Sequence, residues 1–252
     1  MKLSLRFAIL SCCFALAAWP AGRLQAAPDD GWTFDLTPYL WVASAQVDSS
    51  LPSLPPTTPP DEPHFESKLT GAAMLAATIR HGDFGLFMDY DWLRLNTESA
   101  HPGPAFSAVT LRTDISQFTG ALTWRVPTSG SWQLELMAGV RFWNVNGDQE
   151  FAPGILPGFT RSADHSWTDP NIGAVASYAF NDRWFATGKL LWGGFGGDTT
   201  TAVDAVGAVG YRMTPGSSVL LGYRYMREDF TRDHFTWNLS ASGFILGFSF
   251  RL

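Results

Sequence analysis

The last ten residues, Gly243 to Leu252, read G-F-I-L-G-F-S-F-R-L and decide the fold of the chain. Every second side chain of a β-strand points to the same face. One face of this strand is therefore entirely apolar, whereas the other carries mainly small or polar residues. The apolar face continues to the final residue, where a soluble protein is usually polar. Its members are Phe244, Leu246, Phe248, Phe250 and Leu252.

This segment resembles the closing strand of Gram-negative outer-membrane β-barrel proteins, which alternates apolar residues and ends in an aromatic one. Here Leu252 stands in place of the terminal aromatic residue. The resemblance implies that outer-membrane lipid surrounds the protein. It also implies that the barrel assembly machinery recognises this strand, with the five apolar residues above as the assembly signal.

The N-terminal segment predicts export. Lys2 and Arg6 flank or precede an apolar run that is too short to cross a bilayer, and Gln25-Ala26-Ala27 supplies small residues for cleavage. We expect residues 1–26 to be a signal peptide and residues 27–252 to form an outer-membrane β-barrel domain. Cleavage one residue later is the alternative.

Removal of this segment would change the composition of the chain. The chain has two cysteines, Cys12 and Cys13, and both would leave with it, so the mature chain would hold no disulfide and no thiolate metal site. A lipoprotein anchored at one of them is the competing interpretation. The remaining 14 basic and 23 acidic residues give a net charge of −9, which excludes a nucleic-acid binder. No later segment reaches the roughly 20 apolar residues of a transmembrane helix.

Alternation of the same kind recurs from Trp32 onward. It predicts an all-β fold, a transmembrane up-and-down antiparallel β-barrel of about ten strands, with eight as the alternative. Longer loops, such as 146–163, alternate with short turns, such as 181–183, as is typical of these barrels. Leaving aside the unclear strand over 109–125, the apolar faces carry no charge. A charge there would cost about 2–4 kcal/mol at the bilayer midplane. A soluble β-sandwich or lipocalin-like barrel also alternates, but it turns its polar face outward.

Two places disturb the alternation. Pro38 has no N–H to donate within a sheet, and we expect a β-bulge there. Over 109–125 the apolar positions change from one phase to the other, which a bulge near Ser116 would explain, since one extra residue reverses the faces. The first phase comprises Val109, Leu111 and Ile115, and the second comprises Phe118, Leu122 and Trp124.

A narrower resemblance rests on several short segments. They include Thr37-Pro38-Tyr39-Leu40-Trp41, Gly193-Gly194-Phe195-Gly196 and Gly222-Tyr223-Arg224-Tyr225. These segments resemble a group of uncharacterised proteobacterial outer-membrane proteins, and the likeness covers most of residues 169–252. It implies a fold and a location but no activity.

The faces opposite the apolar ones would line the barrel interior. By strand phase they carry five acidic and four basic side chains, which we expect to pair and fill a narrow tube. This predicted interior charge network consists of Asp89, Asp91, Glu135, Arg141, Lys189, Asp204, Arg212, Arg224 and Glu228.

Enzymatic chemistry finds little support in the sequence. Asp89 and Asp91 form an Asp-x-Asp pair, and barrel proteases of the omptin type combine paired carboxylates with an Asp-x-His pair on another strand. Here Asp164-His165 and Asp233-His234 are adjacent, so their side chains point to opposite faces. Lipid A-modifying barrel enzymes need a His with a Ser and an acid, and no such set occurs at strand spacing. We therefore predict no catalytic residue, no metal site and no cofactor.

Three classes of function remain. The first is a structural, surface-interaction or envelope role with a plugged interior. The second is a narrow porin-like channel for ions or small solutes, and the third is a barrel enzyme. A ten-stranded barrel lies near the size at which side chains fill the interior, which favours the first class. The ligand, the solute and the oligomeric state do not follow from the sequence.

Overall fold

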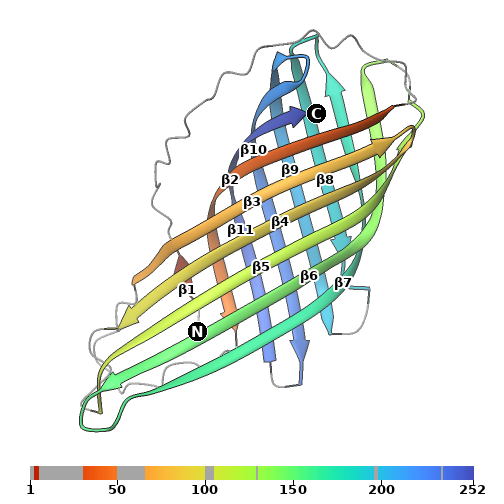
Figure 1. Ribbon diagram of the computed structural model, residues 1–252. Coiled ribbons are helices and arrows are strands. Elements are labelled where there is room, and N and C mark those ends of the chain that lie inside the picture. The colour runs from red at the N-terminus through yellow and green to blue at the C-terminus, as the bar shows by residue number, and fades with distance from the viewer. Residues whose placement is uncertain are drawn as a thin grey trace.

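The computed structural model describes residues 3–5, 31–49, 66–99, 105–128, 130–195, 198–233 and 235–252, all as strands or the connections between them (Figure 1). The strands are β1 (Leu3–Leu5), β2 (Trp32–Ser49), β3 (Glu66–His81), β4 (Phe84–Ser99), β5 (Phe106–Val126), β6 (Trp132–Pro153), β7 (Phe159–Ala179), β8 (Trp184–Gly193), β9 (Thr199–Thr214), β10 (Ser217–Arg232) and β11 (Phe235–Arg251).

The ten strands from β2 to β11 form an up-and-down ring. Each pairs antiparallel with its neighbour in the chain, and β11 pairs back with β2, so the barrel closes. The predicted fold class and the count of ten are therefore confirmed. β1 lies outside the ring on the edge of β2, where Leu3 and Leu5 are the register partners of Val47 and Ala45. The rest of the expected signal peptide lies outside the described residues, and its removal stays a prediction.

An apolar band surrounds the ring. Its outward side chains include Leu122, which is 71% exposed, and the five residues of the expected assembly signal all face outward too. Aromatic rows border the band, and register pairs such as Trp132–Tyr178 and Phe118–Phe142 place their members at common levels. The row at the short turns contains Trp32, Phe84, Trp124, Trp132, Tyr178, Trp184 and Tyr211. The row at the other border contains Tyr90, Phe118, Phe142, Trp192, Tyr223 and Phe244.

The strands continue well beyond the second aromatic row, and we call this continuation the outer half. The expected loop over 146–163 is mostly strand, because β6 extends to Pro153 and β7 begins at Phe159. Residues 227–234, where the sequence also predicts the last loop before the closing strand, are likewise mostly strand. These predictions were wrong because polar outward residues were taken as the end of each strand. The pairing persists, and its inward residues at these levels are buried, with the apolar Phe151 and Phe230 beside the polar Gln149 and Glu228.

In the outer half the ring separates into two sheets. Pairing between β2 and β3 ends at Pro38–Leu75, and β8 ends at Gly193, so β3–β7 form one sheet and β9–β11 with β2 form the other. Figure 1 shows β2 turning away from β3 toward the bottom of the view. At this level Gly243 lies so close to β2 that an added Cβ would stand 1.9 Å from the Val42 carbonyl oxygen. β11 and β2, which belong to the same sheet, thus approach each other closely at this level.

Both predicted bulges are absent from the described pairings. The register of β11 on β2 is the same on either side of Pro38, so this proline ends the pairing with β3 and inserts no extra residue. The register of β4 on β5 is unbroken from Phe84–Trp124 to Ser99–Val109. The apolar phase changes near Ser116 for another reason, which is that the apolar surroundings move from the outside of the barrel to its inside.

An aromatic core lies between the two sheets of the outer half. Indole rings from both sheets meet there, and Trp143 stacks on Trp167 with ring centroids 5.7 Å apart. Trp237 is 1% exposed, so it is as fully buried as a core residue of a soluble domain. Its buried members are Trp143, Val145, Trp167, Met226, Phe230, Phe235, Trp237, Leu239 and Ala241, with Trp41, Ala45, Val47 and Ile115 packed against them.

Candidate functional site

A layer of charged side chains crosses the barrel interior level with the second aromatic row. Arg224 projects inward from β10 between two outward tyrosines, and Asp89 and Asp91 project inward from β4 on either side of outward Tyr90. Because side chains alternate along a strand, a charged residue whose two neighbours point outward into the apolar band must itself point inward. These side chains converge because they stand at one level of a narrow ring.

Arg224 is the centre of the layer. Its Nε and one terminal nitrogen donate to both carboxylate oxygens of Asp204, at 3.0 and 3.1 Å. The guanidinium also lies 3.3 Å from Asp89 Oδ2 and 3.1 Å from Asp91 Oδ2. One cation thus meets three buried carboxylates, and the side chain is 2% exposed. Such a group is held by its partners, since a buried charge without them would be strongly destabilising.

Two further cations complete the layer. Arg141 on β6 donates to Asp204 Oδ2 at 3.1 Å and to Thr119 Oγ1 at 3.1 Å. Lys189 on β8 lies 3.1 Å from Asp204 Oδ2 and 3.4 Å from Asp89 Oδ2. Asp204 therefore accepts hydrogen bonds from two arginines and forms an ion pair with Lys189, which ties β6, β8 and β10 together across the interior.

Tyr39 completes the layer where β2 leaves β3. Its hydroxyl oxygen lies 2.8 Å from Asp89 Oδ1 and 2.7 Å from Asp91 Oδ1, and it accepts a hydrogen bond from Arg224 at 2.8 Å. Asp89 thus contacts the phenol and two cations, and Asp91 contacts the phenol and Arg224. Strand phase alone did not single out Tyr39 as a member of the charge layer, because Trp41 and Ala43 lie on the same face of β2.

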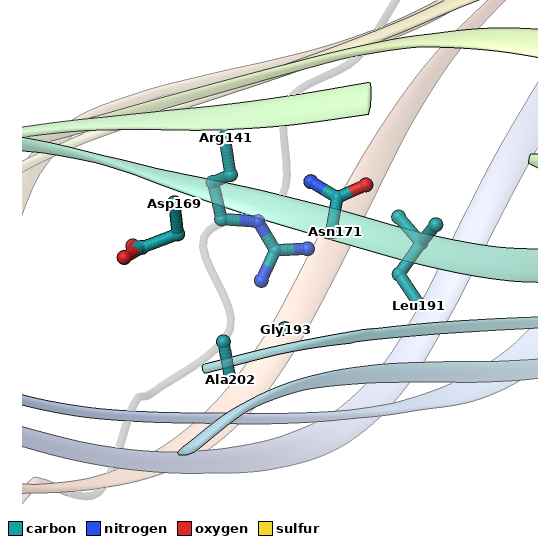
Figure 2. A pocket seen from close by; sticks show the side chains of 6 residues that line it. All are labelled: Arg141, Asp169, Asn171, Leu191, Gly193 and Ala202. Carbon is teal, nitrogen blue, oxygen red and sulfur yellow. The ribbon is translucent and has the colours of Figure 1, made fainter. Parts of the chain in front are cut away.

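Glu228 and Asp169 lie on the side of the layer toward the aromatic core. Glu228 accepts from the Trp167 indole at 3.4 Å and stands 3.9 Å from Arg141. Asp169 accepts from Thr199. Figure 2 shows the Arg141 guanidinium between Asp169 and Asn171, in a small pocket without room for a water molecule. Leu191, Gly193 and Ala202 line the rest of this pocket.

The structure brings together seven of the nine predicted interior charges. The other two lie apart. Glu135 forms its own ion pair near the short turns, 2.6 Å from Arg80 and 3.8 Å from Arg125. Arg212 donates to the carbonyl oxygens of Asn181 and Asp182 and packs over Phe185. Strand phase predicted which way these side chains point, but it carried no information on their height in the barrel.

Apolar side chains fill the interior on both sides of the charge layer. Toward the short turns, Ala121 and Met137 are buried and pack with Phe87, Val175 and Leu191, of which Leu191 stands beside the charge layer as the register partner of Asp204. In the other direction the aromatic core begins at once. The interior is therefore stacked in layers, with a charged layer between two apolar ones.

The described residues do not assemble a recognisable catalytic set. His81 stacks on Trp32 at the short turns, and His165 stacks on Phe235 in the outer half, so neither reaches Asp89 or Asp91. His234 lies outside the described residues. Within the described ranges, no cluster of His, Cys, Asp and Glu has the composition of a metal site. Those same ranges also contain no helix with the length and hydropathy needed to cross a membrane.

Comparison with known proteins supports the fold class. No protein-family model matches the chain, and no curated protein matches it in sequence. Among solved structures it is similar to the outer membrane protease OmpT from Escherichia coli, with 11% identity and a TM-score of 0.50 over 88% of this chain and 93% of that chain. Fold similarity at this identity defines the class, which is that of the outer-membrane β-barrels.

Two further solved structures give weaker matches. One is Ail, the attachment invasion locus protein of Yersinia pestis, with 11% identity, a TM-score of 0.35 and coverage of 88% of this chain and 99% of that chain. The other is the toluene transporter TbuX of Ralstonia pickettii, with 12% identity, a TM-score of 0.36 and coverage of 88% and 90%.

Proposed function

We propose that this protein is an exported outer-membrane β-barrel with a filled interior, and that it acts through its outer half in a structural or surface-interaction role. The observation that carries the proposal is the layered interior. A solute moving along the barrel axis would have to displace the Arg224–Asp204 pair and then the stacked indoles of the aromatic core. Both are buried, and neither leaves a water-filled path as the wide porins do.

Two other features agree with this proposal. The outward apolar band between aromatic rows is typical of barrels that sit in outer membranes. The turn between β6 and β7 stands at the far end of the outer half and exposes Ile155 by 79% and Leu156 by 50%. Apolar side chains presented there suit a protein that meets other molecules at the surface. The closing strand ending at Leu252 would serve the barrel assembly machinery.

Conductance distinguishes a filled barrel from a channel. The purified protein in a planar bilayer should show no steady single-channel current. The variant Arg141→Ala should stay silent as well, because Arg224 and Lys189 still neutralise Asp204. A steady conductance in the wild-type protein would overturn the proposal. A current that opens only in Arg141→Ala would show that the charge layer gates a narrow channel.

Surface labelling tests the location and the orientation. A cysteine in place of Ile155 should react with a membrane-impermeant maleimide on whole cells, whereas one in place of Thr128, in a short turn, should not. The unsubstituted chain controls for Cys12 and Cys13. Reaction at Thr128→Cys alone would show that the barrel is inverted. Intact-mass analysis of the same preparation should show loss of 26 or 27 residues, and an acylated Cys12 or Cys13 at the start would contradict this.

A further inference from the structure

The edge of β2 that faces β3 is free over much of its length. β2 pairs with β3 only from Trp32 to Pro38, whereas it pairs with β11 up to Ser49. Among the described residues, no strand pairs with this edge between Tyr39 and Ser44, and β3 is likewise unpaired on that side from Glu66 to Met74. We call the interval between these two unpaired edges of the described strands the lateral opening.

The opening begins inside the apolar band. Leu40 and Val42 on β2 point outward and are 49% and 45% exposed, and Leu75 across the opening is 40% exposed. Free N–H and C=O groups at this depth are costly, because hydrocarbon offers them no hydrogen-bond partner. An acyl chain would cover the opening without satisfying these groups. The required occupant must bring backbone-like donors and acceptors in a row.

One short strand already occupies part of this edge. β1 pairs antiparallel with β2, with Ser4 opposite Gln46 and its neighbours opposite Ala45 and Val47. It makes no other strand pairing, so its position reports what the edge of β2 accepts. Ala45 and Val47 are half-buried against the aromatic core, whereas Gln46 is exposed. A strand in this place therefore needs apolar residues at alternate positions and tolerates polar ones between them.

We propose that the free edge of β2, from Tyr39 to Val47, is a strand-addition site for an extended peptide segment. The peptide binds antiparallel to β2, with its main chain hydrogen-bonded to the edge and its alternate apolar residues toward the aromatic core. In the intact chain, Leu3–Leu5 occupies the part of this edge from Ala45 to Val47. Once that segment is removed, the edge is open to a peptide of the same pattern. This site is independent of whether the barrel conducts.

Disulfide trapping tests the site and its register. A chain from Pro28 keeps all of β2 to β11, whose ring closes without β1, and it contains no native cysteine. The probe is a synthetic peptide of residues 1–8 carrying Ser4→Cys. The peptide cysteine is supplied as a mixed disulfide with thionitrobenzoate, so that the barrel thiolate attacks it and releases the aromatic thiolate. Exchange with Gln46→Cys should be at least about tenfold faster than with Ser240→Cys, because binding raises the local concentration of the reacting groups. Ser240 is the matched control, since it is the β11 partner of Gln46 and lies one strand further from the edge.

Backbone methylation of the probe separates strand addition from apolar contact. Alternate residues of an antiparallel strand donate to the same neighbour. Two methylated peptides are compared, one with methyl groups on the amide nitrogens of residues 3 and 5 and the other with them on residues 4 and 6. One of the two should lose the rate advantage, because its methyl groups replace the donors to β2, and the other should keep it. Equal rates at Gln46→Cys and Ser240→Cys, or equal loss in both methylated peptides, would overturn the proposal.

Two other occupants would be revealed by the same variants. If Gln46→Cys couples to a second copy of the chain faster than to the probe, the edge is a contact between barrels and the proposal fails. If the rate advantage is present in detergent but lost in phospholipid nanodiscs, lipid covers the opening and the proposal also fails. Heat-modifiable migration of each variant on gels confirms that its barrel is folded.

Discussion

The apolar band and the outer half are built from the same strands with opposite polarity. In the band, side chains such as Leu122 and Leu136 face outward and the charges face inward. In the outer half, Trp143 and Trp237 face inward and residues such as Asn144 face outward. An alternating strand therefore reports which of its faces meets an apolar environment, and this face can change along one unbroken strand.

The charge layer stands at the level where the polarity reverses. On the side of the short turns the strands form a closed ring, and in the outer half they form two sheets around the aromatic core. Arg224 and Asp204 belong to the sheet that includes β2, whereas Asp89, Asp91 and Arg141 belong to the other. Ion pairs across the layer thus hold the two sheets together at the point where strand pairing between them ends.

Removing Arg224 should produce the largest effect. Arg224→Ala leaves Asp89, Asp91 and Asp204 with only two cations, and a broken buried pair costs about 5 kcal/mol at the upper end of measured cases. We expect the heat-modifiable gel shift of the folded barrel to move to a markedly lower temperature. Arg212→Ala is the control, since Arg212 lies outside the charge layer and donates to the turn carbonyls of Asn181 and Asp182. Equal shifts for the two variants would show that the layer does not join the sheets.

A core substitution should weaken the outer half selectively. Trp237→Ala removes a 1%-exposed indole from the aromatic core, at a cost of about 3 kcal/mol. Because the band keeps its own ring of paired strands, we expect limited proteolysis to cut within the outer half and leave a protected band fragment. Trp132→Ala, at a 56%-exposed position, is the control. Loss of the whole barrel in Trp237→Ala would mean that the two regions unfold as one unit.

The smallest of the three effects is expected from a charge introduced on the outer surface, which should reveal where the apolar band ends. Leu136 and Asn144 lie on the same outward face of β6, eight positions apart. Leu136→Arg places a charge in the band and should destabilise the protein by about 2 kcal/mol in lipid bilayers. Asn144→Arg should change the stability very little. Urea titration of both variants in lipid vesicles measures the difference, and similar losses would place Asn144 inside the bilayer.

Sequence alternation was sufficient to predict the ring. The number of strands, the outward apolar faces and the inward direction of the nine charges all follow from period two. It was not sufficient to predict the outer half, because apolar residues were taken to face lipid throughout. β11 shows the missed signal. Trp237, Leu239 and Ala241 occupy odd positions and Phe244 starts an even series, so the phase changes without any break in the strand.

Other features of the site depend on neighbouring strands. The end of pairing at Pro38 reflects the different courses of β2 and β3, which no single-strand pattern contains. The role of Tyr39 follows from that divergence, since its hydroxyl reaches the aspartates of β4 across β3. The separation of Glu135 and Arg212 from the charge layer depends on height in the barrel. Height is set by the stagger between strands, which the alternation within one strand does not report.

The divided pairing of β2 has a consequence for the order of folding. β2 is the first strand of the ring, yet its pairing with β3 ends at Pro38, and β11 supplies its partners from Tyr39 to Ser49. Contacts between residues some two hundred positions apart form slowly, because a long loop must close before they are made. The hairpins from β3 to β7 need no such closure. The outer part of β2 can therefore pair within the ring only once β11, the last strand, is present. In a nascent barrel that lacks β11, the first strand of the ring is paired with β3 from Trp32 to Pro38 but not with a ring strand beyond it.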